Sequence, residues 1–389
     1  MIKIEDVKLE ETAEHKELSA LVDGSRVWFR FPKWASIGLR AEIFLPVAIA
    51  EAMVRAEDVV VEDQRAISAK LLAALPEVVN VFCSWNGDDN HKIQVHATSE
   101  ATAHPSESVI CCFSGGIDSS LSFSQHQAEI TDLLVVMGFD LADAGAQWQQ
   151  LTGRIQKFAN KHGKRVITVE TNIRKVIESR NLSWEASYGC VLASIGIALA
   201  PRTFIIPSGF SYPDLFAYGS HPLLDPLWST ESTTVLHDGL GFSRTQKTEC
   251  LVAHQELLDD LQVCWDHINK NCGRCSKCVR TSLALHLLGA TSVSLPAYPG
   301  TESLSILKPG SLAGVPFTED LIRLAKRTGH LDVARILIRY RDRFLFKYHL
   351  IESVRAILGN RGRWLSHRFA KKGWHALRTK IKSGLVTLD

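Results

Sequence analysis

A loop of small and polar residues between two apolar segments offers the groups that bind phosphate. It has the sequence SGGIDSS and begins at Ser114. Gly115 and Gly116 let backbone N–H groups close around phosphate oxygens without a side-chain clash, and Ser119 adds a second hydroxyl to that of Ser114. Asp118 could hold a Mg²⁺ ion that bridges phosphates. The loop matches neither of two other phosphate-binding motifs, GK[ST] and GxGxxG. The alternative to a phosphate-binding loop is a plain serine–glycine turn between strand and helix.

Four cysteines about 150 residues further along have the spacing of a metal site. Cys264, Cys272, Cys275 and Cys278 follow the pattern C-x7-C-x2-C-x2-C. Four thiolates close a tetrahedral Zn²⁺ site, and two-residue spacers let one tight turn, eased by Gly273, present successive sulfurs to one ion. A closed shell leaves no position for water, so the predicted zinc is structural. An iron–sulfur cluster also takes four cysteines and is the alternative.

The loop and the cysteine knuckle together resemble a known family. SGGIDSS resembles the SGGxDS loop of the PP-loop (N-type) ATP pyrophosphatases, which cleave ATP between the α and β phosphates. These enzymes attach AMP to a substrate oxygen, and a nitrogen or sulfur nucleophile then displaces it. The spacing of the four cysteines, and the helix that follows them, resemble the zinc knuckle of the 7-cyano-7-deazaguanine synthase family. The resemblance covers about residues 108–290.

This resemblance implies a set of site residues and cofactors. ATP and Mg²⁺ would bind at Ser114, Gly115, Gly116, Asp118 and Ser119, with the adenosine near Asp140, which ends the second strand of the domain. The segment RTQKTEC would place Lys247 beside the phosphates, together with Arg244. Lys247 would act with Asp118 in catalysis, since a cation stabilises departing pyrophosphate; the alternative for Lys247 is a solvated helix face. The YPD segment would bring Tyr212 and Asp214 to the substrate pocket.

The chain departs from this family where the substrate would be recognised. After YPD it continues LFAYGSHPLLDPLWST, where the synthase has a short acidic and aromatic segment. His221 and Asp225 in this stretch are candidates for substrate binding or proton transfer. The alternative is a loop held by satisfied polar groups. The ATP chemistry therefore follows from the resemblance more directly than the substrate does.

The elements that must position these residues alternate between strand and helix. Continuous apolar runs predict strands at 108–113, 132–140, 165–172 and 202–210, with helices from about 119, at 141–163 and at 184–201. Such runs indicate a parallel sheet covered on both faces. We expect an α/β fold with a five-stranded parallel sheet, and the resemblance implies an adenine nucleotide α-hydrolase-like arrangement. Ligands bind beyond the carboxyl ends of such strands, where the glycine loop falls.

Composition shifts predict three parts. Residues 1–104 form an α+β domain, 105–315 the PP-loop domain with the knuckle at 264–278, and 316–389 a basic helical region. Within the first part, the segment 67–85 predicts a helix broken near Pro76 and followed by a strand. The segment 96–108 is polar and predicts a linker.

Charge and composition narrow the partners. The net charge is only +2, but the last 70 or so residues carry a large excess of Lys and Arg, interleaved with aromatic residues such as Phe346 and Trp364. This region predicts binding to nucleic acid or an acidic partner, or else an amphipathic helical cap. No apolar run is long enough to span a membrane, and the N-terminus lacks a signal segment. We therefore expect a cytoplasmic protein with reduced cysteines, and a homodimer is the candidate assembly.

The expected function is an ATP-dependent ligase that forms AMP. It would adenylate an oxygen of a small-molecule carboxylate or amide, and a nitrogen nucleophile would displace the AMP. One alternative is a tRNA or other nucleic-acid-modifying enzyme of the PP-loop type. A thiolase of that kind would need a sulfur-carrying cysteine near the loop, for which Cys190 is the candidate. The other alternative is a non-catalytic ATP-binding or nucleic-acid-binding module.

Overall fold

The computed structural model describes residues 1–389 except 87–92, 104–105, 140–144, 265, 268–269 and 355–389. Asp140, the expected adenosine ligand, and Trp364 lie outside the described residues. The chain divides into two compact units, Met1–Pro299 and Gly300–Asp389. Each unit is described by itself.

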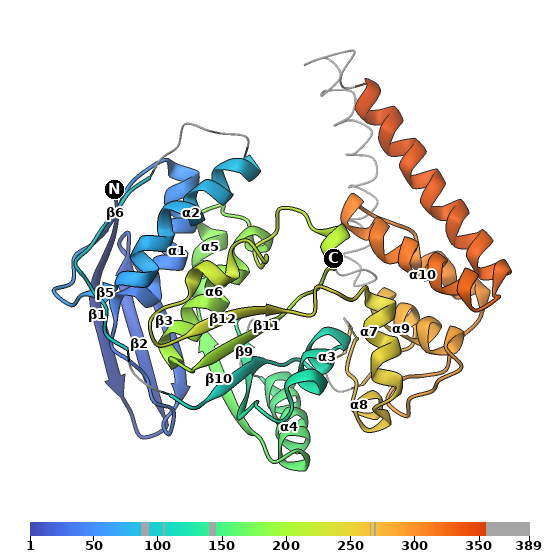
Figure 1. Ribbon diagram of the computed structural model, residues 1–389, viewed down its shortest axis with the longest axis horizontal. Coiled ribbons are helices and arrows are strands. Elements are labelled where there is room, and N and C mark those ends of the chain that lie inside the picture. The colour runs from blue at the N-terminus through green and yellow to red at the C-terminus, as the bar shows by residue number, and fades with distance from the viewer. Residues whose placement is uncertain (87–92, 104–105, 140–144, 265, 268–269, 355–389) are drawn as a thin grey trace. The chain divides into compact units, whose positions relative to one another are not determined.

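The described part of the first unit is built on a ten-stranded sheet with the order β12-β11-β8-β9-β10-β3-β2-β1-β4-β6 (Figure 1). Its strands are β1 (Ile2–Glu11), β2 (His15–Val22), β3 (Ser25–Pro32), β4 (Val59–Val61), β6 (Val95–His96), β8 (Val109–Cys112), β9 (Asp132–Met137), β10 (Arg165–Thr171), β11 (Thr203–Pro207) and β12 (Thr234–Asp238). A separate two-stranded sheet pairs β5 (Ile67–Ser68) with β7 (Ser99–Glu100). The expected α/β class is confirmed, as a large mixed sheet flanked by helices.

Five neighbouring strands, β8 to β12, are all parallel. The first of them, β8, lies in the middle, with β9 and β10 on one side and β11 and β12 on the other. Cys111 at the centre of β8 pairs with Leu133 of β9 and Ile205 of β11. The chain order therefore reverses between β8 and β11, and at such a point the loops after the two strands diverge and leave a crevice.

The N-terminal strands continue this sheet. β1, β2 and β3 pair in antiparallel order, and β3 pairs antiparallel with β10 through Arg30–Glu170 and Phe29–Thr171. The side chain of Asn172 extends the joint, because its Oδ1 accepts from Trp28 N at 3.0 Å and its Nδ2 donates to Arg26 O at 2.8 Å. The domain boundary near residue 104 remains a prediction from the sequence, since strands from both sides of it belong to one sheet.

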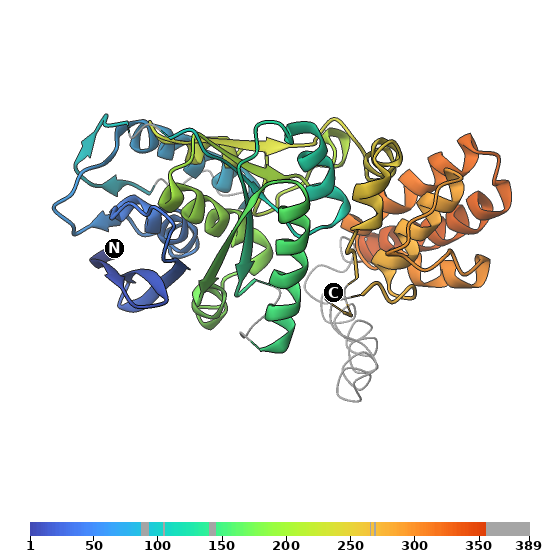
Figure 2. The same ribbon diagram turned by 90° about the horizontal axis from the view of Figure 1, so that it is seen from below.

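Helices cover the parallel strands on both faces (Figures 1 and 2). One core gathers α1 (Leu45–Arg55), α2 (Ala69–Asn86), α5 (Ile173–Ser179) and α6 (Trp184–Leu199). The other gathers α3 (Ile117–His126), α4 (Ala146–Lys161), α8 (Gln255–Asp259) and α9 (Ser276–Leu287), with α7 (Arg244–Val252). The strands serve both cores because side chains alternate: Ile110 belongs to the first core, and Val109 and Cys111 belong to the second.

The expected break at Pro76 is wrong. α2 runs without interruption from Ala69 to Asn86 with Pro76 inside it, so the residues up to 85 that were expected to form a strand are helical. A proline there removes one helical hydrogen bond. Val78, Val79 and Phe82 are all buried at helical spacing, so the packing of this face outweighs the local cost of the proline.

α6 is buried almost all round and makes two close approaches. A Cβ on Gly189 would lie 1.9 Å from the carbonyl oxygen of Gly219, and one on Gly196 would lie 2.8 Å from the ring of Phe204. The Gly219 N–H donates to Glu185 O at 2.8 Å. Gly189 lets the segment before residue 220 lie directly on the helix, and this contact fixes the connection between β11 and β12, whereas Gly196 makes room for Phe204 of β11.

The described part of the second unit is helical. It contains the 3₁₀ segments η4 (Thr301–Leu307) and η5 (Leu312–Gly314), α10 (Val315–Arg327) and a helix over 331–354. Its buried residues include Leu321, Leu324 and Leu337. No helix among the described residues of either unit is long and apolar enough to cross a membrane.

Candidate functional site

The glycine loop joins β8 to α3 in a conformation that exposes N–H donors. Gly115 has φ +78°, and its carbonyl accepts from Gln262 N at 2.8 Å, so it turns away from the loop. Among the described residues, the backbone N–H groups of Gly115, Ile117 and Asp118 have no acceptor. They surround the N-terminus of α3, where the helix dipole adds positive potential. The loop therefore has the donor set of an anion site.

Ser114 and Ser119 stabilise the shape of the loop. The Ser119 hydroxyl donates to Gly116 O at 3.1 Å, and the Ser114 backbone N–H donates to the Ser119 hydroxyl at 3.4 Å. Ser119 is buried, whereas Ser114 is exposed. Ser114 is therefore the hydroxyl that a bound anion reaches first.

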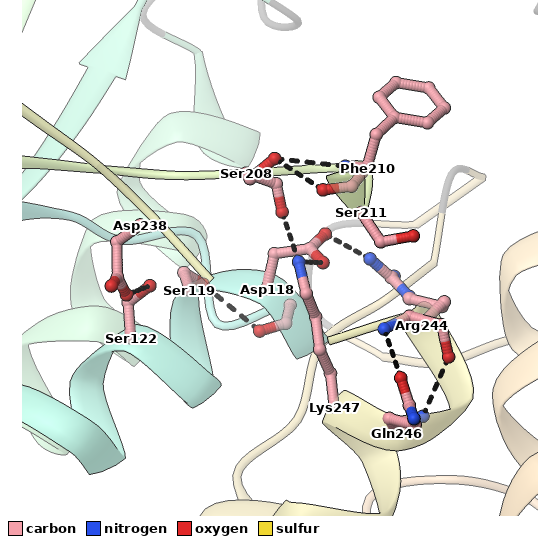
Figure 3. A network of polar contacts seen from close by, with 12 residues as sticks. Asp118, Ser119, Ser122, Ser208, Phe210, Ser211, Asp238, Arg244, Gln246 and Lys247 are labelled. Carbon is pink, nitrogen blue, oxygen red and sulfur yellow. Dashed lines mark hydrogen bonds and ion pairs between the residues drawn. The ribbon is translucent and has the colours of Figure 1, made fainter. Parts of the chain in front are cut away.

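Three charged side chains meet next to this loop (Figure 3). Asp118 Oδ1 accepts from Lys247 Nζ at 3.1 Å, and Asp118 Oδ2 forms an ion pair with Arg244. Lys247 Nζ also donates to the carbonyl of Ser208, which follows β11. Ser208 and Asp118 stand on the two sides of the point where the sheet order reverses, so Lys247 links the loops that follow β8 and β11.

The local sequence explains how α7 aims these cations. Ser243 caps the helix by accepting from Gln246 N, while the Gln246 side chain accepts from Ser243 N at 2.8 Å. This capping box fixes the first turn, which contains both Arg244 and Lys247. Lys247 is only 1% exposed, which rejects the alternative of a solvated helix face.

Electrostatics keep Asp118 ionised. Burial alone would raise its pKa, but the charges of Arg244 and Lys247 and their hydrogen bonds lower the pKa to about 2. The carboxylate in turn compensates the buried ammonium of Lys247. The side chain of Asp118 is still 23% exposed, so one edge of the network is open to solvent.

Asp238 and Arg154 lie near the site and make different contacts. Asp238 accepts from Ser122 Oγ at 2.6 Å and lies 3.3 Å from His126 Nε2, so it holds α3 against β12 instead of facing the loop. Arg154 of α4 donates from Nη2 to Ser114 O at 2.8 Å. Sequence reasoning missed Arg154, because a single arginine on an amphipathic helix carries no motif.

The expected substrate residues fall into two groups. Tyr212 and Asp214 form the short 3₁₀ helix η2 (Tyr212–Asp214) just after β11. Tyr212 is 64% exposed, and Asp214 accepts from the Ser211 hydroxyl. Behind them Phe210 contacts the rings of Phe216 and Tyr218. This segment lies on the carboxyl side of the parallel strands, as the loop does.

His221 and Asp225 belong to a buried network. Asp225 accepts from the Ser220 hydroxyl at 2.6 Å and from His221 N at 3.2 Å, and it lies 2.7 Å from His237 Nδ1. His221 Nδ1 accepts from Leu223 N at 3.1 Å. Asp225 is fully buried and His221 is 5% exposed. For His221 and Asp225 this geometry favours the alternative of a loop held by satisfied polar groups, while Nε2 of the neighbouring His237 is buried without a hydrogen-bond partner among the described residues.

The four knuckle cysteines form one cluster. Their sulfurs all lie within 4.8 Å of one another, and the pairs Cys272–Cys278 and Cys264–Cys275 are 3.9 Å apart. Thiolates bound to one zinc ion at about 2.3 Å in tetrahedral geometry would be separated by roughly 3.8 Å. In a [4Fe–4S] cluster each thiolate binds a different iron, which holds the sulfurs further apart. The cysteines therefore fit a single metal ion such as zinc.

The residues around the cysteines support a closed metal site. The backbone N–H groups of Arg274 and Cys275 donate to Cys272 Sγ, and the N–H of Cys278 donates to Cys275 Sγ. Gly273 makes the turn at φ +73°, where a Cβ would lie 2.9 Å from Pro296. Such N–H donors stabilise thiolates and orient them, as a metal requires.

No family model, curated protein or solved structure matches the chain.

Proposed function

We propose that the protein is an ATP-dependent ligase that releases AMP and pyrophosphate. It adenylates an oxygen of a small-molecule carboxylate or amide, and a nitrogen nucleophile displaces the AMP. The observation that carries the proposal is the meeting of the SGGIDS loop with Lys247 and Arg244 across the crevice between β8 and β11. The resemblance of the loop and knuckle to the PP-loop ATP pyrophosphatases, and to the 7-cyano-7-deazaguanine synthase family among them, supports it.

The sheet supports a nucleotide at this place. Open α/β sheets bind ligands at the point where the strand order reverses, and here that point carries the glycine loop on one side and Ser208 on the other. We assign the parallel strands β8 to β12 to the adenine nucleotide α-hydrolase-like fold. Tyr212, Asp214 and the aromatic residues behind them then border the place for the substrate.

The charges fit ATP with Mg²⁺. Unpaired N–H donors of Gly115, Ile117 and Asp118 suit phosphate oxygens, and Lys247 suits the negative charge that develops on departing pyrophosphate. When bound, Mg²⁺ would neutralise phosphate charge, and Asp118 would hold it, since Mg²⁺ takes one or two carboxylates plus phosphates. Asp118 would then no longer pair with Arg244 and Lys247, and both cations would pair with the phosphates. Before ATP binds, the ion pairs with Asp118 keep both cations beside the loop.

The decisive experiment identifies the products. Purified protein is incubated with ATP, Mg²⁺, ammonium and a panel of carboxylic acids, and we expect AMP and pyrophosphate. Lys247→Met should lower the rate by roughly 10²- to 10³-fold, as the loss of one preorganised charge-stabilising group does elsewhere. Lys175→Ala, which removes an exposed lysine from α5, should leave the rate unchanged. ADP and phosphate as products would overturn the proposal.

A nucleic-acid-modifying enzyme is the second candidate, and one observation favours it. Arg335, Arg339, Arg343 and Lys347 are all exposed and recur every four residues along the helix over 331–354. They form a basic stripe about 18 Å long on one helix face. The thiolase version is disfavoured, because Cys190 is fully buried and burial raises its pKa to about 12, which removes the reactive thiolate at neutral pH.

A further inference from the structure

Arg154 lies against the glycine loop from an element that carries no motif. It is in the middle of α4, and its Nη2 donates to the carbonyl of Ser114 at 2.8 Å. Its Nη1 lies 2.5 Å from the position that a Cβ on Gly115 would occupy. The guanidinium therefore fills the space beside the loop that a larger residue than glycine would take.

In the described part of the chain, the positive charge of Arg154 has no acidic partner. Among the described residues, no carboxylate lies within ion-pair distance of it, and its Nε is buried without a hydrogen-bond partner. Burial lowers the pKa of Arg154 to about 10, with Asp260 opposing this only from a distance. Arg244 and Lys247, by contrast, share Asp118.

This arrangement is costly unless an anion joins it. Arg154 is half-buried, so its charge is partly removed from water without a partner, and its buried, unpaired Nε adds to the cost. Arginine offers five N–H donors in a planar fork that matches phosphate, and only Nη2 has an acceptor among the described residues. The nearest anion-binding feature is the loop, whose Gly115 N–H also has no described acceptor.

We propose that Arg154 is a phosphate-binding residue of this site, which holds the pyrophosphate end of ATP against the glycine loop; the inference rests on the proposed function. With Asp118 balancing one of the three cations, Arg154, Arg244 and Lys247 leave a net charge of +2 beside the loop. That charge suits an anion such as pyrophosphate more than it suits AMP. Arg154 therefore selects for the triphosphate and retains pyrophosphate until AMP is transferred.

The test compares two ligands and two matched variants. Binding of inorganic pyrophosphate with Mg²⁺, and separately of AMP, is measured by calorimetry on the full chain. Arg154→Gln should weaken pyrophosphate binding by roughly tenfold or more, as the loss of a charge-assisted hydrogen bond predicts, with AMP binding unchanged. Lys157→Gln removes an exposed charge from the same helix and should alter neither. Arg154→Lys should lie in between, because it keeps the charge without the fork.

The outcomes separate this inference from the proposed function. Equal pyrophosphate binding by wild type and Arg154→Gln would overturn the inference while AMP-forming turnover still stood. Equal weakening of pyrophosphate and AMP would also overturn it, because Arg154 would then only support the loop through Ser114. Selective loss of pyrophosphate binding in a protein that makes ADP would support Arg154 and overturn the proposed function. Melting temperatures of all variants show whether each is folded.

Discussion

At the scale of single residues, Asp118 sets the charge balance of the candidate site. It brings together Lys247, which is 129 residues away in the sequence, and Arg244, and so holds two cations beside the glycine loop. Without the carboxylate, a lysine that is 1% exposed would lie next to an arginine with no local compensation. The same side chain thus holds both cations in place and is the group that we propose to bind Mg²⁺.

Replacement of Asp118 tests this balance through stability. The pKa in the folded protein is about 2, below the usual aspartate value of 3.8, so the stabilisation is complete above pH 3.8 and is lost as the pH falls towards 2. Asp118→Asn should lower the free energy of unfolding by about 2 kcal/mol at pH 7. The difference from wild type should shrink below pH 4 in urea unfolding curves. Glu107→Gln, an exposed carboxylate, should show no such trend, and a pH-independent difference would contradict the ion-pair explanation.

The sequence indicated part of this site and concealed the rest. Asp118 and Lys247 stand in segments with a recognisable pattern, and the structure brings them within 3.1 Å. His221 and Asp225 have equally suggestive side chains, but only the fold shows that Asp225 accepts from the backbone N–H of His221 and contacts His237. Arg154 could not be found from the sequence, because its role depends on where α4 packs and not on its neighbours in the chain.

At the scale of elements, local patterns predict an element well when its environment is uniform. The parallel strands are buried on both faces, so each appears as an unbroken apolar run, and β8 to β11 were predicted. α2 was misjudged because proline signals a break locally, while the buried face formed by Val78 and Phe82 acts through tertiary packing. The pairing of β3 with β10 depends on two strands more than a hundred residues apart, and neither strand encodes its partner.

The knuckle is the element most directly open to test. Cys275 caps the N-terminus of α9, so loss of a metal should loosen both the turn and this helix. We expect one zinc ion per chain by mass spectrometry, and a strong chelator should release it, lower the melting temperature and expose four reactive thiols. Cys275→Ser should abolish stoichiometric zinc, whereas Cys250→Ser on α7 should retain it. Iron in place of zinc, or a metal-free stable protein, would contradict this assignment.

At the scale of the whole molecule, the chain combines one large α/β unit with a basic helical unit. The near-zero net charge conceals this, because the excess of Lys and Arg in the second unit cancels the acidic balance of the first. Composition alone predicted this contrast. The single sheet that unites the first unit was not predicted, since domain divisions drawn from composition cannot detect strand pairing across a linker.

The basic stripe should bind a polyanion in a salt-dependent manner. Affinity for a short RNA or DNA duplex is measured over a range of salt concentrations, and each phosphate contact contributes about 0.9 to the slope of log K against log salt for B-form DNA. Arg343→Gln combined with Lys347→Gln should reduce the slope by roughly 1.8 on a DNA duplex. Lys157→Gln combined with Lys175→Gln removes the same charge from the first unit and should change it little. An unchanged slope in the stripe variant would exclude this surface as the site of polyanion binding.

The joint between β3 and β10 also matters while the protein is being made. Pro32 ends β3 and Arg165 begins β10, 133 residues later. Synthesis at about 5–20 residues per second leaves roughly 7–27 s in which the edge of β3 has no native partner. An unpaired edge can join a strand of another nascent chain. Arg26 and Arg30, both paired with Glu17, place charged side chains on β3. Charged side chains disfavour pairing of an open edge with another chain, and here they act until β10 has been synthesised.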